Sequence, residues 1–257
     1  MNLSFVQNIA AGYKNPSQKI RVMSEEWTLK NIFCPFCSGF LKKAKNNARV
    51  LDFVCANDKC NEYFELKSSK NKMGSKVMAG AYRPMREKLR NGVFPNFFFL
   101  KYDYSSKSVT DFIAVPGFVF SESMIEKRKP LSSSAVRHDW VGCNILTKNI
   151  PDNCKIYYVR GNKECLKRSV AVKWKKILFL KQYSDPNKKS WITDIIKCIE
   201  LLKKREFSIK ELYDFESDLA RKHPENKHIK EKIRQKLQLL RDNKYLDFVS
   251  KGFYKLK

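Results

Sequence analysis

The chain of 257 residues is long enough for one large domain or two of ordinary size, each with a buried core. Hydrophobic residues make up 43% and aromatic residues 13% of it, a composition that excludes a disordered chain. Lysine and arginine number 52 against 26 aspartates and glutamates, and the resulting net charge of +26 favours a polyanionic partner over a merely soluble basic surface.

The sequence predicts a cytoplasmic protein with no membrane association. Its first residues lack the basic and apolar segments of a secretory signal, and no apolar run approaches the roughly 20 residues that span a bilayer. Cysteines stay reduced in the cytoplasm, so eight of them favour a metal site over disulfides. The chain has no G-x-x-x-x-G-K-[ST] loop and no segment dedicated to dimerisation, so we expect no nucleotide cofactor and a monomer.

The first part of the chain is predicted to combine helices and strands. Two segments have a helical pattern: the amphipathic stretch Gln18–Leu29, within a helical region 1–30, and a segment at about Lys76–Arg90. Five segments have the pattern or composition of strands: Ala48–Cys55, Glu62–Ser68, Asn96–Tyr104, Thr110–Pro116 and Lys155–Val159. This order indicates an α/β (α+β) domain, a mixed sheet flanked by helices.

A polar, proline-containing segment, Tyr183–Ser190, predicts a domain boundary, so we expect one domain at 1–184 and a second at 185–257. Three helices are expected in the second domain: Trp191–Lys204, a helix capped by Ser208 that runs to about Lys222, and about Asn226–Asn243. A hairpin of Tyr245–Val249 and Phe253–Leu256, turning at Lys251–Gly252, completes the domain. Three helices and a terminal hairpin indicate a winged helix-turn-helix.

Four cysteines have the spacing of a tetrathiolate zinc site. A C-x2-C pair is followed after 17 residues by a C-x4-C pair: Cys34, Cys37, Cys55 and Cys60. Four thiolates fill the coordination shell and leave no position for an activated water, so the predicted role of Zn²⁺ is structural. The isolated cysteines Cys143, Cys154, Cys165 and Cys198 are expected to be small core residues.

Two carboxylates and a lysine lie close to the second cysteine pair. Asp52 falls in one predicted strand, and Glu65 and Lys67 point to the same face of the next. Asp52, Glu65 and the carbonyl of Leu66 offer Mg²⁺ hard oxygen ligands, and Lys67 can stabilise developing negative charge. This D-x12-E-x-K pattern is that of the PD-(D/E)xK nucleases.

The pattern by itself is also compatible with a solvated strand face, and it gains weight from the strands, the cysteine cluster and the positive charge around it. Three scattered histidines are too few for an HNH nuclease site.

In the last predicted helix, Lys227, Lys230 and Arg234 fall off the apolar stripe. An exposed basic face of this kind suits a recognition helix in a major groove, although a protein contact or a solvated face would give the same pattern.

Segments from nearly the whole chain carry a family resemblance: Ser17–Lys19, Glu26-Trp27, C-P-x-C, Asp52-Phe53, Phe64–Ser68, Gly80–Tyr82, Pro95–Leu100, Trp140 with Gly142–Ile145, Phe215–Leu219 and His228–Arg241. They resemble the methyl-directed restriction endonucleases of the DpnI type. The resemblance implies a PD-(D/E)xK core with an inserted four-cysteine zinc knuckle, followed by a winged helix that also reads DNA. It also implies cleavage of double-stranded DNA at GATC when the adenine carries an N6-methyl group.

The resemblance places the family's catalytic residues on Asp52, Glu65 and Lys67 and its methyl-contacting tryptophan on Trp140. Leu51 departs from the proline of the generic motif, a position that performs no chemistry. Without the resemblance, Trp140 would be expected in the core. We also expect the winged helix to recognise the methylated site a second time, with Trp191, Lys227 and Arg234 as the candidate residues.

Two other functions remain compatible with these residues. A regulator with a zinc module and a winged helix would bind methylated DNA without cutting it. A PD-(D/E)xK nuclease directed at DNA structures would cut without regard to methylation.

Overall fold

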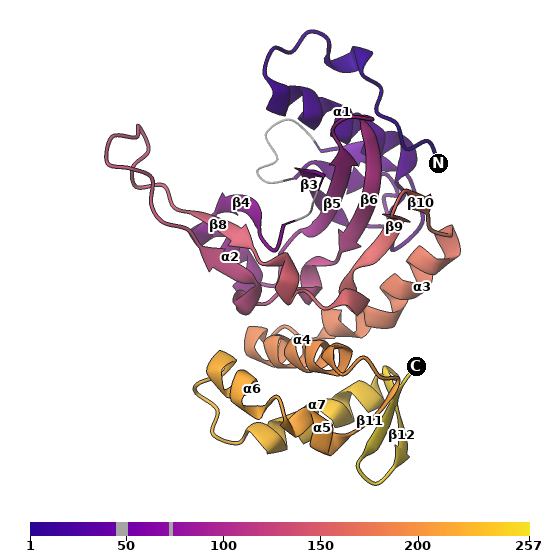
Figure 1. Ribbon diagram of the computed structural model, residues 1–257, viewed down its shortest axis with the longest axis vertical. Coiled ribbons are helices and arrows are strands. Elements are labelled where there is room, and N and C mark those ends of the chain that lie inside the picture. Colours follow the sequence, from indigo (N-terminus) through magenta and orange to yellow (C-terminus); the bar gives the residue numbers. More distant parts are fainter. Residues whose placement is uncertain (45–50, 72–73) are drawn as a thin grey trace.

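The computed structural model describes residues 1–44, 51–71 and 74–257. The described chain forms two stacked parts, and the second begins with α4 (Pro186–Leu201) (Figure 1). No helix in these ranges is both long and apolar enough to cross a membrane.

A seven-stranded sheet forms the centre of the first part. Its strands lie in the order β1-β2-β3-β5-β6-β9-β10. Their bounds are β1 Leu41–Lys43, β2 Phe53–Cys55, β3 Tyr63–Lys70, β5 Asn96–Asp103, β6 Ser108–Val115, β9 Ile156–Arg160 and β10 Lys163–Glu164. Among the strands described, only β3 and β5 pair in parallel. A parallel pair requires a crossover connection, and α2 (Tyr82–Arg90) lies in it.

Aromatic residues fill one face of this sheet because strand side chains alternate between faces. Phe98 and Phe112 pack there against each other and against Tyr158 of β9, and Phe112 also packs against Trp27 of α1 (Pro16–Asn31). The helix α3 (Lys167–Ile177) packs against β9. A second, three-stranded sheet has the order β4-β8-β7, with β4 Val77–Ala81, β8 Gly142–Ile145 and β7 Ile125–Lys127.

Two helix predictions in this part were wrong at their first residues. Helix α1 begins only at Pro16, where Asn15 accepts a hydrogen bond from Ser17 N, and before it the one helical turn is η1 (Asn8–Ala10). The helix expected from about Lys76 begins at Tyr82, because the preceding residues form β4 and pair with β8. Long-range pairing there overrides the local helical pattern.

The predicted strands lie close to the observed ones, with shifts of one or two residues at most ends. The exception is the strand expected at Ala48–Cys55. Residues 48–50 of it lie outside the described ranges, and Asp52 stands one residue before β2.

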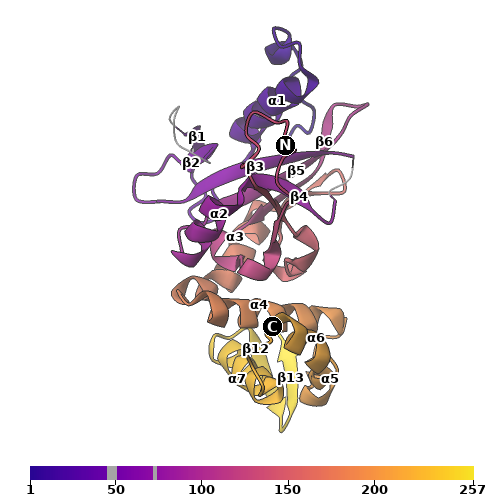
Figure 2. The same ribbon diagram turned by 90° about the vertical axis from the view of Figure 1, so that its left-hand side faces the viewer.

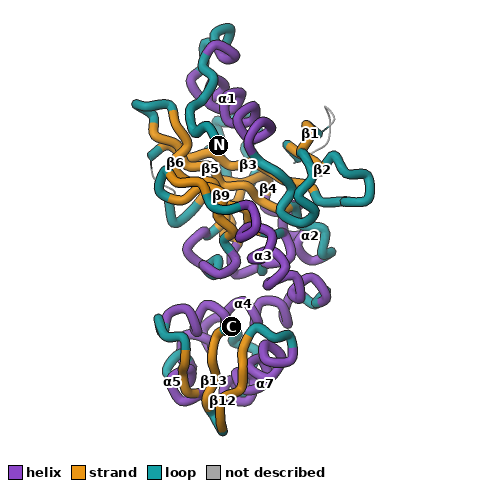
Figure 3. The backbone as a smooth tube through the Cα atoms, turned by 90° about the vertical axis from the view of Figure 1, so that its right-hand side faces the viewer, coloured by secondary structure: helices purple, strands orange, loops and turns teal. Residues whose placement is uncertain are grey.

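The second part is a small helical unit closed by a three-stranded sheet (Figure 3). After α4 come β11 Glu206–Ser208, α5 Ile209–Tyr213, α6 Glu216–Lys222, α7 Ile229–Asp242, β12 Leu246–Ser250 and β13 Phe253–Leu256. The hairpin turns where it was predicted, and β11, which was not predicted, pairs with β13. The chain therefore has the predicted mixed α/β fold with a C-terminal helix-turn-helix.

The helix expected from Ser208 to Lys222 is divided into α5 and α6. Its start was predicted correctly: Ser208 caps α5, and the Glu211 carboxylate accepts a hydrogen bond from the Ser208 backbone N–H in a capping box.

The two parts meet where α4 faces the lower edge of the first part (Figure 2). Glu200 of α4 accepts hydrogen bonds from the backbone N–H groups of Asp152 (2.7 Å) and Asn153 (2.6 Å), at the start of η5 (Asp152–Cys154). The Asn153 side chain also donates to the hydroxyl of Tyr245 at 3.0 Å. Backbone and side-chain hydrogen bonds thus join the parts.

Candidate active site and metal centre

A cavity of about 350 Å³ brings Asp52, Glu65 and Lys67 together. Helix α1, the segment before β2 and strand β3 supply its lining: Arg21, Glu25, Leu51, Asp52, Glu65, Leu66, Lys67 and Ser68. Glu65 and Lys67 share one face of β3, and in the parallel register they lie beside Phe97 and Phe99 of β5. The sheet core therefore fixes the backbone that carries both side chains.

Glu65 is a buried carboxylate with an incomplete set of partners. Its side chain is 7% exposed, and its Oε1 forms an ion pair with Lys67 Nζ. Among the described residues, no group donates a hydrogen bond to the buried Oε2. Burial raises the pKa of Glu65, while the positive charge of Lys67 acts in the opposite direction. An unsatisfied buried acceptor of this kind is costly for a protein unless a ligand completes it.

Asp52 is held by backbone hydrogen bonds on two sides. Its N–H donates to the carbonyl of Phe64 at 3.0 Å, and its Oδ2 accepts from the N–H of Leu66 at 2.6 Å. Asp52 is therefore hydrogen-bonded to the two residues of β3 that flank Glu65. Leu66 itself is half-buried and packs against the hydrophobic core.

The donor set of this cavity fits a hard divalent cation. The carboxylates of Asp52 and Glu65 offer oxygen ligands, and the buried Oε2 is an acceptor that a cation would satisfy. The Leu66 carbonyl is the third oxygen that the sequence pattern proposes.

Three charged residues of this site were not identified from the sequence. Arg21 and Glu25 reach the cavity from α1, where Glu25 forms ion pairs with Arg21 (3.6 Å) and Lys43 (3.7 Å). Lys88 of α2 contributes to the positive field on Glu65. Only the spacing of Arg21 and Glu25, one helical turn apart, was visible in the sequence, and it did not indicate which way that face points.

The four cysteines of the predicted zinc site do converge. All four sulfurs lie within 4.8 Å of one another, with Cys34 Sγ and Cys60 Sγ 3.8 Å apart and Cys37 Sγ and Cys55 Sγ 3.4 Å apart. A tetrahedral ion with sulfur ligands at about 2.3 Å requires sulfur–sulfur separations of about 3.8 Å. The cluster therefore has the size that a zinc ion needs.

Burial affects the same sulfurs. It raises the pKa of Cys34 and raises the pKa of Cys60 to about 12, so a bound cation would have to stabilise these two thiolates at neutral pH. The cluster also fixes the connection between β2 and β3, where Cys55 N–H donates to the Glu62 carbonyl at 2.9 Å. Asp52 lies just before that connection, and Glu65 follows it.

The isolated cysteines behave mostly as expected. Cys143, Cys154 and Cys198 are buried, and Cys165 is half-buried. Cys143 adds a positional clue, because its pKa is raised to about 11 by burial and by the negative charge of Glu65. Cys143 and Glu65 are therefore close enough for their charges to interact.

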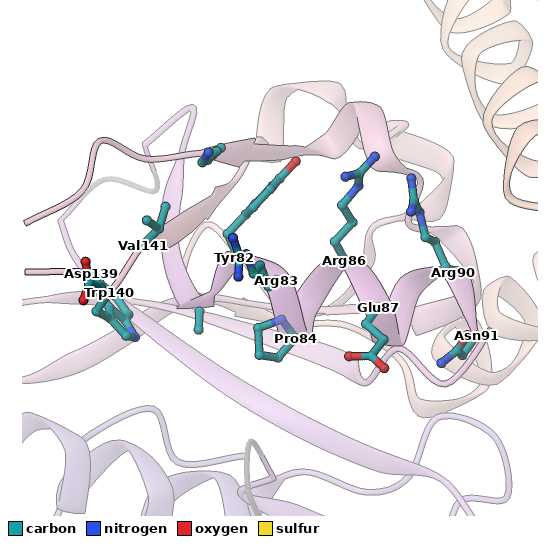
Figure 4. Close-up of a pocket in the computed structure, with 12 residues that line it drawn as sticks. Tyr82, Arg83, Pro84, Arg86, Glu87, Arg90, Asn91, Asp139, Trp140 and Val141 are labelled. Atoms are coloured by element: carbon teal, nitrogen blue, oxygen red, sulfur yellow. The ribbon is translucent and has the colours of Figure 1, made fainter. Parts of the chain in front are cut away.

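Trp140 precedes β8 and is partly exposed. It lines a cavity of about 880 Å³ together with residues of α2. Figure 4 shows Trp140 and Asp139 at one end of this cavity and Arg86 and Arg90 towards the other. Both arginines form ion pairs with Glu122, at 2.9 and 2.6 Å. The cavity thus joins an aromatic ring to a basic rim, next to the start of β8.

In the C-terminal part, the structure places the predicted basic residues just before α7 and on its exposed face. Lys227, Lys230 and Arg234 are exposed. Lys230 forms an ion pair with Glu216 at 3.2 Å, and Arg234 donates to the hydroxyl of Tyr213 at 2.7 Å. These contacts orient two of the three basic side chains.

Trp191 is 2% exposed and its ring stacks on His223 with centroids 4.0 Å apart. It forms a wall of a cavity of about 410 Å³ that also contains Lys188, Lys232 and Lys236. Lys236 is 2% exposed, and it forms no ion pair within the described ranges. The sequence analysis did not single out Lys236, and nothing in the local pattern indicated its burial.

The comparisons with known families cover nearly the entire chain. A family model described as the Dam-replacing family, DpnI, matches residues 1–183. A second model, described as the Dam-replacing HTH domain, matches residues 187–256. The two matches meet within the segment where α4 begins.

Proposed function

Because this chain belongs to the Dam-replacing family of DpnI-type methyl-directed restriction enzymes, we propose that it hydrolyses both strands of double-stranded DNA at GATC sites whose adenines carry N6-methyl groups. We further propose that it does so as a monomeric type II enzyme, with a catalytic domain at 1–184 and a DNA-binding domain at 185–257. The family is one of restriction endonucleases.

One observation supports the proposed Mg²⁺-dependent hydrolysis. Glu65 is buried beside Lys67 and within reach of Asp52, and its Oε2 has no donor among the residues described. A purely structural carboxylate at this depth would be fully hydrogen-bonded. The arrangement supports a site that is completed by Mg²⁺.

The proposed roles follow from position. Asp52 and Glu65, with the Leu66 carbonyl, would hold Mg²⁺, which when bound lowers the pKa of water and offsets charge on the scissile phosphate. The ammonium of Lys67 lies against Glu65 and can orient the attacking water and stabilise charge that develops on the phosphate. Lys88 of α2 adds positive charge that acts on Glu65.

The cysteine cluster is proposed to hold Zn²⁺ in a structural role. Its four sulfurs would occupy every position of a tetrahedral ion. The ion would fix the connection between β2 and β3 and, through it, the separation of Asp52 and Glu65.

For methyl recognition we propose Trp140. The N6-methyl group lies in the major groove and offers only apolar surface, which an aromatic ring can cover. Burying one methyl group contributes about 0.8 kcal/mol, so the two methyls of a fully methylated site contribute about 1.6 kcal/mol, roughly a fifteenfold preference. Stronger discrimination requires a second reading of the DNA.

We propose that the C-terminal part supplies this second reading. Lys227, Lys230 and Arg234 would contact DNA from the start and the exposed face of α7. Trp191 would contribute as a wall of the lysine-rich cavity rather than as an exposed side chain. A chain ending near Asp185 that discriminated as well as the whole protein would refute the second reading.

A plasmid assay tests the proposal. One plasmid carries N6-methyladenine at its GATC sites, and a matched plasmid does not. With Mg²⁺, we expect linear and then shorter fragments from the methylated plasmid only, because both strands are cut. The Asp52→Ala variant should produce none.

The same assay separates the alternatives. Cleavage of both plasmids would refute methyl dependence and favour a structure-directed nuclease. Tight binding to the methylated plasmid without cleavage would refute the nuclease and favour a DNA-binding regulator.

A further inference from the structure

Gly142, the first residue of β8, is buried directly beneath the Trp140 ring. A Cβ built on Gly142 would lie 2.6 Å from Trp140 Cη2 and 2.8 Å from Trp140 Cζ3. Real Cβ atoms are not found this close to a ring carbon, so the ring occupies the space that any other residue would need. Residues two apart on an extended chain face the same side, which explains why this side chain reaches this backbone.

The backbone around the contact is fixed. Trp140 N–H donates to the Arg137 carbonyl at 2.9 Å, Tyr82 N–H to the Val141 carbonyl at 2.9 Å, and Arg128 N–H to the Gly142 carbonyl at 3.0 Å. With these hydrogen bonds in place, an added methyl group would be relieved by rotation of the ring. The ring is the far end of a side chain and opens onto the cavity of about 880 Å³.

The glycine is not required for its backbone conformation. Glycines with left-handed φ in the described chain are Gly92, Gly161 and Gly252, and Gly142 is not one of them. Alanine can therefore adopt the backbone of position 142 without strain. What the glycine uniquely provides is the missing side chain.

The contact also lies near the reacting centre. Burial raises the pKa of the next residue, Cys143, and the charges of Glu65, Lys67 and Arg128 also affect it. The side chain of Arg128 lies over the same glycine, with its Cδ 3.5 Å from the Cβ position. The ring and the arginine thus both contact Gly142, at the start of the strand that also carries Cys143.

We propose that Gly142 is a specificity-determining residue: its lack of a side chain forms the surface on which the Trp140 ring lies and so sets how the ring meets the methyl group. This inference rests on the proposed function of Trp140. Gly142 acts through the tryptophan and is therefore a positioning residue. It contributes to the choice between methylated and unmethylated DNA and not to the chemical step.

A double-mutant cycle tests the proposal. Cleavage of methylated and unmethylated plasmid is measured for Gly142→Ala, Trp140→Ala and the double variant. Gly142→Ala should reduce the methylated-to-unmethylated preference by up to roughly fifteenfold, the value expected for two methyl groups. Because the glycine acts through the ring, Gly142→Ala should cause no further loss in the Trp140→Ala background.

The matched control is Gly80→Ala on the neighbouring strand β4, where the nearest atom to the added Cβ is Met85 Cγ at an ordinary 3.9 Å. This control should keep the full preference and the same thermal unfolding midpoint as Gly142→Ala.

Tryptophan fluorescence gives a readout without DNA. Three of the four tryptophans, Trp27, Trp174 and Trp191, are at most 4% exposed, so acrylamide quenching reports mainly on Trp140. Quenching should increase in Gly142→Ala and not in Gly80→Ala.

The outcomes separate the two claims. If Trp140→Ala leaves the preference unchanged, the methyl-reading role of Trp140 fails, and the role of Gly142 in specificity fails with it. If Trp140→Ala lowers the preference but Gly142→Ala does not, only the inference about Gly142 is overturned. Equal loss of cleavage on both DNAs with a lowered unfolding midpoint would show general disruption and would also overturn it.

Discussion

The two parts of the molecule each bury a carboxylate, and they satisfy it differently. Asp194 of α4 is 3% exposed and accepts from Lys222 Nζ at 2.6 Å and is paired with His223 Nε2 at 3.0 Å. Glu65 of β3 is also buried, yet its Oε2 has no donor within the described chain.

The difference separates a structural ionic cluster from a site that needs a ligand. Each oxygen of Asp194 has a partner within the protein, so the cluster stabilises the fold by itself. An oxygen of Glu65 is left free at the floor of a cavity. A buried group that the protein itself leaves unsatisfied is a better indicator of a ligand site than burial or charge alone.

The strongest test removes the charge from Glu65. Glu65→Gln keeps the shape and should lower the cleavage rate of methylated plasmid by at least roughly 10²–10³-fold, as loss of a group that stabilises charge in the reaction does. Its free energy of unfolding should not fall, because burying an amide in place of a carboxylate removes a desolvation cost. If this variant cleaved at the wild-type rate, Glu65 would not belong to a ligand site that the reaction needs.

The cysteine cluster adds a third buried set of groups to the comparison, and like Glu65 it is proposed to need a ligand. Cys60→Ser should weaken zinc binding by more than the roughly 10–100-fold that loss of an outer partner of a ligand costs. Zinc content by mass spectrometry and the unfolding midpoint measure the effect. Cys165→Ser, a half-buried thiol outside the cluster, is the matched control and should retain both.

The reciprocal test targets Asp194. Asp194→Asn should lower the free energy of unfolding by about 1.5–3 kcal/mol, because it weakens charge-assisted hydrogen bonds to Lys222 and His223. Urea denaturation measures this loss. The cleavage rate at saturating DNA should be unchanged, and a large fall in that rate for a chain that remains folded would show that the cluster is not merely structural.

The smallest expected effect concerns Lys236, a buried lysine of the C-terminal part without an ion pair among the described residues. Burial lowers its pKa to about 8, with Lys232 and Lys188 acting in the same direction. Between about pH 8 and 10.5 the unfolded chain binds more protons at this residue than the folded chain, so stability should rise with pH over that range.

Lys236→Met should remove that rise and increase the free energy of unfolding at neutral pH by about 1–3 kcal/mol. Denaturation at pH 7 and pH 10 measures both effects. Lys227→Met, an exposed lysine near the start of the same helix, should leave the pH dependence unchanged. An unaltered profile for Lys236→Met would show that its charge is satisfied in the folded protein.

The features that the sequence predicted well are those governed by local periodicity. Glu65 and Lys67 had to share a face because strand side chains alternate, and the structure puts both in one cavity with Asp52. The spacings of the four cysteines allowed them to converge, and they do. The Ser208 cap was visible because capping is a local interaction.

The features that could not be predicted depend on contacts between distant residues. The β4 segment was assigned to a helix because only its pairing with β8 makes it a strand. The burial of Trp191 depends on His223, which follows another helix. Glu25 and Lys88 act on the cavity from helices whose orientation is set by packing on the sheet.

The hydrogen bonds of Glu200 have a consequence for how the protein can change in evolution. The acceptors are the two oxygens of one side chain on α4, while the donors are the main-chain N–H groups at positions 152 and 153. Main-chain donors are present whatever residue occupies those positions, with the exception of proline. This docking contact therefore tolerates sequence drift on one side and depends on a single carboxylate on the other.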